Sequence, residues 1–343
     1  MIIGFDGSRA FVGERSGTEN YSYQLLKHLL KIDKKNKYIV YTKNNLKWPR
    51  LWTQGGLALK TFTDKMDVLF VPAHTLPVIR KPGLKTVVTV HDLGSEYLPQ
   101  MHQLKQRLYL SFMQKYQLKT ASKIIAVSKA TKEDLVKKIG IDSKKIDVVY
   151  EGFDENLFKP VACNLSPANY FLFVGTVQPR KNLTRLIQAF SRVILSDERR
   201  ISLVIAGQKG WMSDEIYALP KKLGIEKRVK FLGYVMDKKL PELYSGAIAL
   251  VFPSLFEGFG LPILEAQACG CPVITSNVSS MPEVAGKGVI LVDPYNIDDI
   301  VKGMERSQGT GNREQLIKAG FENIKRFSWE KCAKETLRVF NEL

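Results

Sequence analysis

The sequence lacks any apolar run near the roughly 20 residues that a membrane-spanning helix needs, although 45% of its 343 residues are hydrophobic. Its first residues, Met1–Asp6, lack the basic segment and following apolar stretch of a secretory signal peptide. They have instead the pattern of a buried strand. These absences predict a cytoplasmic protein, and they leave open a peripheral position on the inner face of the membrane.

Metal and redox motifs are missing as well. The cysteines are Cys163, Cys269, Cys271 and Cys332, and none forms the C-x2-4-C pair of a structural zinc site. No Asp-x-Asp occurs, and the pair at 298–299 is expected at a helix start, where acidic side chains favour the dipole. No G-x-G-x-x-G follows a strand, which excludes a nicotinamide dehydrogenase. The sequence predicts neither a metal site nor a cofactor.

Charge is strongly unbalanced, with 51 Lys and Arg against 34 Asp and Glu and a net charge of +17. Residues 1–160 carry +12 of this excess and the remaining residues +5. No acidic residue occurs between Tyr97 and Lys132, a stretch that contains these basic residues: Lys105, Arg107, Lys115, Lys119, Lys123, Lys129 and Lys132. Such a field attracts phosphates on a lipid surface, a nucleic acid or an anionic substrate.

A basic nucleic-acid-binding protein without catalysis would explain this charge. No recognised nucleic-acid module is present, however, so we do not expect a nucleic acid among the partners. An anionic membrane surface remains a candidate partner of the basic first half.

Short apolar runs alternate with segments of helical spacing, which predicts an α/β fold of parallel sheets covered by helices. The first half has expected strands at Ile39–Tyr41, Val68–Val71, Thr86–Val90, Lys123–Val127 and Ile146–Tyr150, and helices at Glu19–Ile32 and Gln103–Lys119. The second half has expected strands at Tyr170–Val174, Ser202–Ala206, Val229–Leu232, Ala249–Phe252 and Pro272–Thr275, and helices such as Leu183–Leu195 and Asp214–Leu223.

Length and pattern together predict two Rossmann-like domains. We place the first at 1–163 and the second at 164–327, because the stretch between 158 and 167 contains two prolines and little periodicity. Ser328 is a candidate N-cap of a closing helix over 328–343. Ligands of such folds bind at the carboxyl ends of the strands, which predicts a ligand site in a cleft between the two domains.

The most informative stretch is PSLFEGFGLPILEA at 253–266. A strand ends at Phe252, a loop with two glycines follows, and a helix is expected to begin at Pro262. Strand, Gly-rich loop and helix N-terminus together form an anion site. Glu257 lies in the loop, where its carboxylate can accept hydrogen bonds from sugar hydroxyls. Glu265 lies one turn into the helix, where a carboxylate suits a ribose diol.

A second motif, FVGTVQPRKNL at 173–183, also follows a strand and opens a helix. Its adjacent cations, Arg180 and Lys181, suit a diphosphate whose negative charge grows as a sugar leaves. The pair would take the place of a metal ion at that diphosphate.

These two motifs resemble a known family. Glu257 and Glu265 match the E-x7-E motif of retaining glycosyltransferases with the GT-B fold, which has two Rossmann-like domains facing a cleft. The string Phe-Gly-x-Pro-x-Leu-Glu-Ala resembles glycosyltransferase family four. Gly-Thr-x-x-Pro-Arg-Lys-Asn is similar to bacterial polysaccharide mannosyltransferases, although many members have arginine where this chain has Thr176. The resemblance spans essentially the whole chain and is most specific in the second domain.

The resemblance implies roles at the donor site. Glu257 would contact hydroxyls of the donor sugar near the reacting carbon, and Glu265 would hold the ribose. Arg180 and Lys181 would neutralise the leaving nucleoside diphosphate. The backbone amides of Phe259, Gly260 and Leu261 would face the sugar and phosphates. The backbone of Val235 would face the nucleobase.

In the first domain the resemblance covers Val-His-Asp. A lone histidine is most often structural, but His91 stands at the end of a central strand, and the resemblance implies that it faces the donor sugar near the reacting bond. Asp92 would orient it or meet the acceptor, and Ser128 matches another family position on the acceptor side. Gly17 and Thr18 correspond to a Gly-rich loop beside the diphosphate, where many members have two adjacent glycines.

The predicted reaction moves a hexose, mannose from GDP-mannose, to a glycan or lipid-linked acceptor with retained anomeric configuration. The resemblance implies front-side attack, in which the departing phosphate takes the acceptor's proton. The enzyme would contribute positioning and charge stabilisation without a metal. UDP-glucose or dTDP-rhamnose is the alternative donor, because the expected base contacts are made by the backbone.

Overall fold

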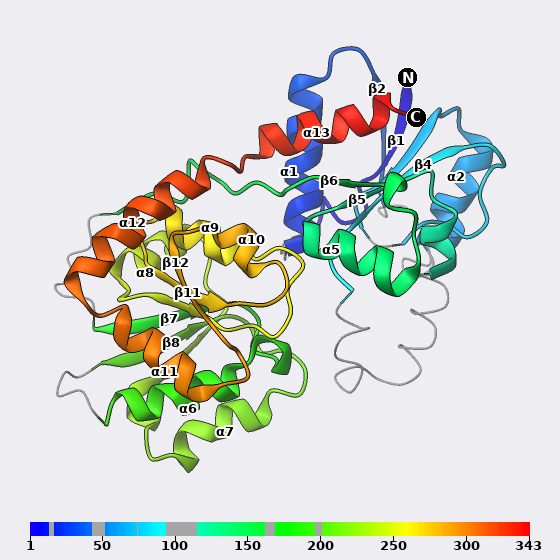
Figure 1. The fold of residues 1–343 in the computed structure, drawn as a ribbon. Coiled ribbons are helices and arrows are strands. Elements are labelled where there is room, and N and C mark those ends of the chain that lie inside the picture. The colour runs from blue at the N-terminus through cyan, green and yellow to red at the C-terminus, as the bar shows by residue number, and fades with distance from the viewer. Residues whose placement is uncertain (14–16, 43–51, 74, 94–114, 162–168, 196–200) are drawn as a thin grey trace. The chain divides into compact units, whose positions relative to one another are not determined.

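The computed structural model describes residues 1–13, 17–42, 52–73, 75–93, 115–161, 169–195 and 201–343. The chain divides into two compact units: Met1–Gly152 with Phe327–Leu343, and Phe153–Arg326. The expected boundary at 163/164 lies in 162–168, outside the described residues. Each unit is a parallel sheet with helices against it (Figure 1), so the predicted α/β class is confirmed.

The first unit contains a six-stranded parallel sheet in the order β2-β1-β3-β4-β5-β6. The central strands are almost wholly apolar because both of their faces are buried. The strands are β1 Ile2–Asp6, β2 Lys37–Tyr41, β3 Val68–Val71, β4 Lys85–Val90, β5 Lys123–Ala126 and β6 Ile146–Val148. The strands expected in this half are therefore confirmed, with small shifts at their ends.

Helices of the first unit pack against this sheet and against each other. They are α1 Gly17–Ile32, η2 Trp52–Leu57, α2 Ala58–Thr63, α5 Lys129–Asp134, η4 Leu135–Ile139, η5 Ser143–Lys145 and α13 Trp329–Asn341. As expected, Ser328 caps α13, since its side chain accepts from the amide of Lys331 at 3.1 Å. Helix α13 runs beside α1 (Figure 1). Most of the helix expected at 103–119 lies outside the described residues.

The second unit repeats the architecture with the strand order β12-β11-β10-β7-β8-β9. Its strands are β7 Tyr170–Val174, β8 Ser202–Ala206, β9 Val229–Gly233, β10 Leu250–Phe252, β11 Val273–Ser276 and β12 Val289–Val292. The sequence predicted the first five. It missed β12, an outer strand in which exposed Leu291 lies between buried neighbours.

The second unit also contains helices, one of which has a side-chain cap. They are η6 Pro179–Lys181, α6 Leu183–Val193, α7 Asp214–Lys222, η7 Glu226–Arg228, η8 Asp237–Lys239, α8 Leu240–Gly246, α9 Leu261–Ala268, α10 Met281–Ala285, α11 Ile297–Arg306 and α12 Thr310–Ile324. The side chain of Asn296 caps α11 by accepting from the amides of Asp298 and Asp299, which lie in the first turn as expected.

Helix α9 begins one residue earlier than predicted. Gly260 has φ 109°, a left-handed conformation that favours glycine, and the helix follows it directly at Leu261. Pro262 is therefore the second helical residue and not the first. Among the described residues, no helix combines the length and the hydropathy that crossing a bilayer requires.

Candidate functional site

Three loops of the second unit leave neighbouring strands at the same edge of the sheet. They follow β7, β10 and β11, which are adjacent in the order β11-β10-β7. Because the strands are parallel, the loops after them meet at one edge. This strand order brings the two sequence motifs, 175–182 and 253–260, side by side and places 277–280 against them.

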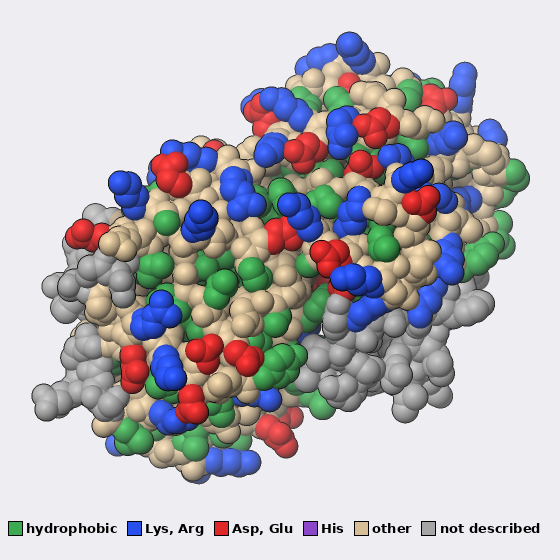
Figure 2. All heavy atoms as spheres, in the orientation of Figure 1, with side chains coloured by type: hydrophobic (Ala, Val, Ile, Leu, Met, Phe, Trp, Pro, Cys, Tyr) green, Lys and Arg blue, Asp and Glu red, His purple; other side chains and the backbone are tan. Residues whose placement is uncertain are grey.

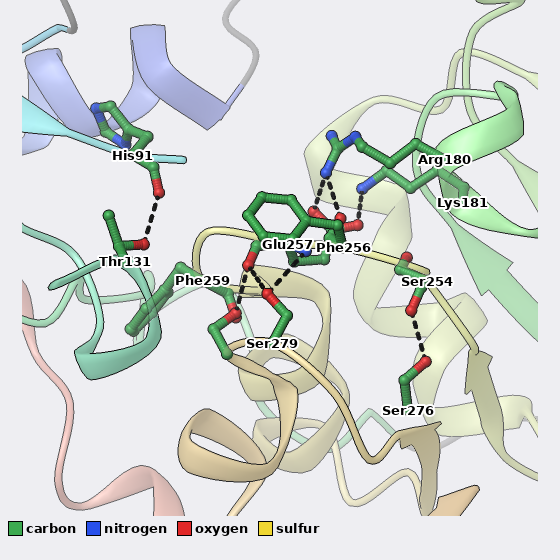
Figure 3. Close-up of polar contacts among 11 residues, drawn as sticks. His91, Thr131, Arg180, Lys181, Ser254, Phe256, Glu257, Phe259, Ser276 and Ser279 are labelled. Atoms are coloured by element: carbon green, nitrogen blue, oxygen red, sulfur yellow. Dashed lines mark hydrogen bonds and ion pairs between the residues drawn. The ribbon is translucent and has the colours of Figure 1, made fainter. Parts of the chain in front are cut away.

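The centre of this edge is an ion cluster. Glu257 accepts from Arg180 Nη1 at 2.9 Å through Oε2, and from Lys181 Nζ at 2.6 Å through Oε1 (Figure 3). Glu257 and Lys181 are only 7% and 8% exposed. Burial by itself would raise the pKa of Glu257, but the two cations lower it below its ordinary value. Glu257 is therefore ionised, and it binds both cations.

Backbone contacts fix the cations to the neighbouring loop. The Arg180 carbonyl accepts from the amide of Leu255 at 3.0 Å, and Arg180 Nη1 also donates to the Phe256 carbonyl at 2.6 Å. Asn182 follows with φ 60°, and its Nδ2 donates to the Pro253 carbonyl at 3.0 Å. These hydrogen bonds therefore join the loop after β7 to the loop after β10.

The second glutamate has a different environment. Glu265 Oε2 accepts a 2.8 Å hydrogen bond from the hydroxyl of Tyr244, a fully buried residue of α8. Burial raises the pKa of Glu265 to about 7; Asp237 adds to the rise, and the Tyr244 hydrogen bond opposes it. Glu265 therefore changes charge near neutral pH, whereas Glu257 stays ionised.

The predicted nucleobase position is at the end of β9. Val235 is half-buried there. Large apolar side chains around the ends of β8 and β9 are exposed, namely Trp211, Met212, Tyr234 and Met236. This edge therefore offers an apolar surface, which suits the flat face of a base.

The predicted amides of 259–261 lie where the loop enters α9. Phe259 is buried, Gly260 takes the left-handed turn, and Leu261 begins the helix. The α9 N-terminus therefore lies four residues after Glu257, one residue nearer than the sequence predicted.

In the first unit, His91 is buried at the end of β4. Its Nδ1 lies 3.0 Å from Oε1 of Glu151, and its Nε2 lies 3.0 Å from the carbonyl oxygen of Pro72. Tyr21 packs edge-on against the ring at 4.6 Å. Burial alone would lower the pKa of His91, but the Glu151 carboxylate and the Pro72 carbonyl raise it above its ordinary value. Both ring nitrogens therefore face acceptors, an arrangement that favours the protonated imidazolium.

Other predicted residues of this unit have local roles. Ser128 is fully buried and caps α5 by accepting from the amide of Thr131 at 3.0 Å. Thr131 in turn donates to the His91 carbonyl at 3.2 Å. Asp92 is half-buried beside His91. Residues 14–16 lie outside the described residues, while Gly17 begins α1, where a Cβ would meet no described atom beyond its chain neighbours within 4 Å, and the Thr18 carbonyl accepts from Ser22.

Several partners of these residues were not predicted. They are Glu151, Tyr244, Ser279 and Ser280. Glu151 follows β6 closely, and the two serines follow β11, so polar residues after predicted strands were the available signal. Tyr244 lies in a helix and gave no such signal. In the described part of the chain, no three His, Cys, Asp or Glu side chains are grouped so that they could hold a metal ion.

Comparison with known proteins gives a consistent picture. The family model of glycosyl transferases group 1 matches residues 160–322, and the family model of glycosyltransferase family 4 matches residues 32–157. O-antigen chain mannosyltransferase B of Escherichia coli is 32% identical over 269 residues, which cover 76% of this chain and 71% of that protein.

Two solved structures share the fold over nearly all of both chains. Sucrose-phosphate synthase of Thermosynechococcus elongatus has a TM-score of 0.80 at 21% identity, covering 99% of this chain and 98% of that one. HepE of Anabaena in complex with UDP-glucose has a TM-score of 0.76 at 20% identity, covering 100% and 99%.

Proposed function

This chain belongs to the group 1 glycosyltransferases, with a family 4 first domain, and we propose that it transfers mannose from GDP-mannose with retained anomeric configuration. The GT-B fold and the glycosyltransferase activity class predicted from the sequence are both confirmed. The relative named as an O-antigen mannosyltransferase supports mannose as the sugar. A glycan or lipid-linked acceptor is proposed on the same ground.

The observation that carries the proposal is the ion cluster of Arg180, Lys181 and Glu257. Its two cations bind Glu257, which stands four residues before α9 begins, and a helix N-terminus favours anions. A departing nucleoside diphosphate needs this stabilisation most as the glycosidic bond breaks. We therefore propose that the two cations neutralise the leaving group without a metal ion.

Each glutamate then has its own role. Glu257, ionised and held by two cations, would accept hydrogen bonds from hydroxyls of the donor sugar and fix the sugar near the reacting carbon. Glu265 would hold the ribose diol, oriented by Tyr244. The exposed apolar side chains after β8 and β9 would lie near the base. The departing phosphate would accept the acceptor's proton, so no protein base is assigned.

His91 is proposed to act as a fixed charge. Because both of its ring nitrogens face acceptors, the ring cannot take a proton from the acceptor. Its family position implies that it faces the donor sugar. An imidazolium there would stabilise negative charge on the departing donor.

A second donor is favoured by one observation. The HepE structure with UDP-glucose has the same fold as this chain. The predicted base contacts are made by the backbone around Val235, which distinguishes bases weakly. UDP-glucose is therefore the second candidate, and dTDP-rhamnose is the third.

The acceptor side is proposed to work at an anionic membrane surface on the cytoplasmic side. Exposed apolar and basic side chains meet on the first unit, where the amide of Lys81 donates to Thr61 of α2. We call this the α2 surface; it consists of Leu59, Lys60, Phe62, Lys65, Ile79 and Lys81. Figure 2 shows apolar side chains over α2 at the right edge, beside Lys and Arg. Apolar groups flanked by lysines suit a bilayer with acidic headgroups.

The proposal is tested by thermal unfolding with a panel of nucleoside diphosphates, followed by donor turnover. A ligand at 100 times its Kd adds about 2.7 kcal/mol of stability. GDP is expected to raise the Tm most, and GDP-mannose to be consumed. A larger shift with UDP would favour the second donor. Retention of DNA without any shift by a nucleoside diphosphate would overturn the assignment.

A further inference from the structure

Two consecutive serines hold the loop that carries Glu257. Ser279 Oγ donates to the Glu257 carbonyl at 2.6 Å, and the Glu257 amide lies 3.4 Å from the same hydroxyl (Figure 3). Ser280 Oγ lies 2.9 Å from the Glu257 carbonyl and 2.9 Å from the Phe259 carbonyl. The backbone of Glu257 is therefore bound from the loop after β11, while its side chain is bound from the loop after β7.

Ser280 makes these contacts instead of an N-cap hydrogen bond to its own helix. It occupies the N-cap of α10, where a serine side chain ordinarily accepts from an amide of the first turn. Ser280 makes no such cap hydrogen bond. Its hydroxyl is fully buried and faces the two loop carbonyls. A group that stabilises a helix elsewhere is thus used here to hold the loop.

Ser279 makes its contact from an unfavourable backbone conformation. Its φ is 57°, in the left-handed region that non-glycine residues seldom adopt. Such strain persists where surrounding contacts demand it, and it is concentrated at functional sites. In this conformation Ser279 makes its contacts with Glu257.

We propose that Ser279 and Ser280 are positioning residues of the donor site, which we call the serine clamp. The clamp fixes the backbone of Glu257 before donor binds, and Ser280 also fixes the turn at Phe259 that leads into α9. Ser279 thereby acts on sugar positioning, and Ser280 acts on both the sugar and the phosphates. The expected effect of the clamp on kcat rests on the proposed function, whereas its expected effect on the loop does not.

The test compares Ser279→Ala, Ser279→Gly and Ser280→Ala with Ser307→Ala. Ser307 is a matched control, because it is also buried in the second unit and donates to a carbonyl, that of Met304, at 2.7 Å. Hydrogen exchange is measured on peptides that contain 256–261. Thermal unfolding, kcat and the affinity for free nucleoside diphosphate are measured on the same proteins.

Both Ser279 variants are expected to exchange the loop amides about fivefold faster and to lose about fivefold in kcat, as one net hydrogen bond implies. Their affinity for nucleoside diphosphate should stay near that of the parent, whereas Ser280→Ala should lose affinity as well. Ser279→Gly should unfold at a higher temperature than Ser279→Ala, because glycine relieves the positive φ. If the two Ser279 variants lose the same fraction of kcat but differ in Tm, the loss of kcat does not follow stability, as it would if the role of Ser279 were merely structural.

The clamp is overturned if Ser279→Gly matches the parent in both exchange and kcat, since the hydroxyl would then be irrelevant. It is also overturned if all four variants lose kcat in proportion to the fall in their Tm. If the parent turns over no nucleotide sugar, the proposed function fails, and the exchange comparison with Ser307→Ala still decides the clamp.

Discussion

The hydroxyl of Tyr244 donates a 2.8 Å hydrogen bond to Oε2 of Glu265, the proposed ribose ligand, and this contact favours the ionised carboxylate. Burial raises the pKa of Glu265 to about 7, and the hydrogen bond counters part of that rise. The same contact raises the pKa of Tyr244 itself, in addition to its burial, so the phenol remains a donor at all working pH values. Nucleotide affinity should therefore depend on pH near neutrality.

We expect affinity for free nucleoside diphosphate to increase as pH rises through about 7, because only the ionised Glu265 accepts from both ribose hydroxyls. Tyr244→Phe removes a contact that lowers the pKa, so its midpoint should move to higher pH. In Glu265→Gln the nucleotide affinity should no longer depend on the titration of residue 265, and any remaining pH dependence should come from the ligand phosphates alone. Calorimetry between pH 5.5 and 8.5 measures all three; parallel curves for parent and Glu265→Gln would disprove the assignment.

The buried pair of His91 and Glu151 predicts a pH-dependent stability. The pKa of His91 is raised above its ordinary value near 6.5, so the pair stabilises the fold fully below that pH and less as pH rises through the folded-state pKa. Glu151→Gln should therefore lower Tm most at pH 6 and least at pH 9. The exposed Glu155 on the same segment provides the control, Glu155→Gln. A Tm difference that is constant with pH would exclude a charged His91.

The cation pair predicts metal independence. Turnover should survive EDTA, because Arg180 and Lys181 neutralise the leaving group. Lys181→Met should weaken nucleoside diphosphate binding by roughly 1.5–3 kcal/mol, the range for a hydrogen bond to a charged group. Lys222→Met, at an exposed site of the same unit, is the control. Loss of activity in EDTA with recovery in magnesium or manganese would refute this mechanism.

The α2 surface predicts binding to acidic vesicles that weakens as salt rises. Phe62 is 50% exposed, and Phe62→Ser should reduce vesicle binding without changing nucleotide affinity. Leu195→Ser, at an 86% exposed apolar residue of the second unit, is the matched control. Equal binding of parent and Phe62→Ser, or equal binding to neutral and acidic vesicles, would rule out this surface.

The sequence predicted most strands because a strand buried on both faces has a continuous apolar run. It missed β12, an outer strand, although Val289–Val292 is itself a short apolar run, in which Leu291 is exposed. It placed the start of α9 at Pro262 because proline favours a first turn, whereas the left-handed Gly260 sets the start at Leu261. Local signals thus placed the ends of most predicted strands and helices within a residue or two.

The motifs around Arg180 and Glu257 were also visible in the sequence, and so was the family. Their mutual contact was not, since it depends on β7 and β10 being neighbours, and strand order is not encoded locally. The same holds for Glu151 beside His91, which are 60 residues apart, and for the serine clamp. Roles assigned to these residues stay predictions until they are measured.

The central claim is that Glu265 binds nucleotide and Glu257 positions the sugar. The decisive measurement pairs nucleoside diphosphate affinity by calorimetry with kcat on the sugar donor, for Glu265→Ala and Glu257→Gln. Glu265→Ala should lose roughly 1.5–3 kcal/mol of nucleotide affinity, which appears mainly in KM. Glu257→Gln should keep or gain affinity, because Arg180 and Lys181 lose a competing carboxylate, while kcat falls steeply. Loss of nucleotide affinity in Glu257→Gln with kcat retained, or parental behaviour of both variants, would contradict the account.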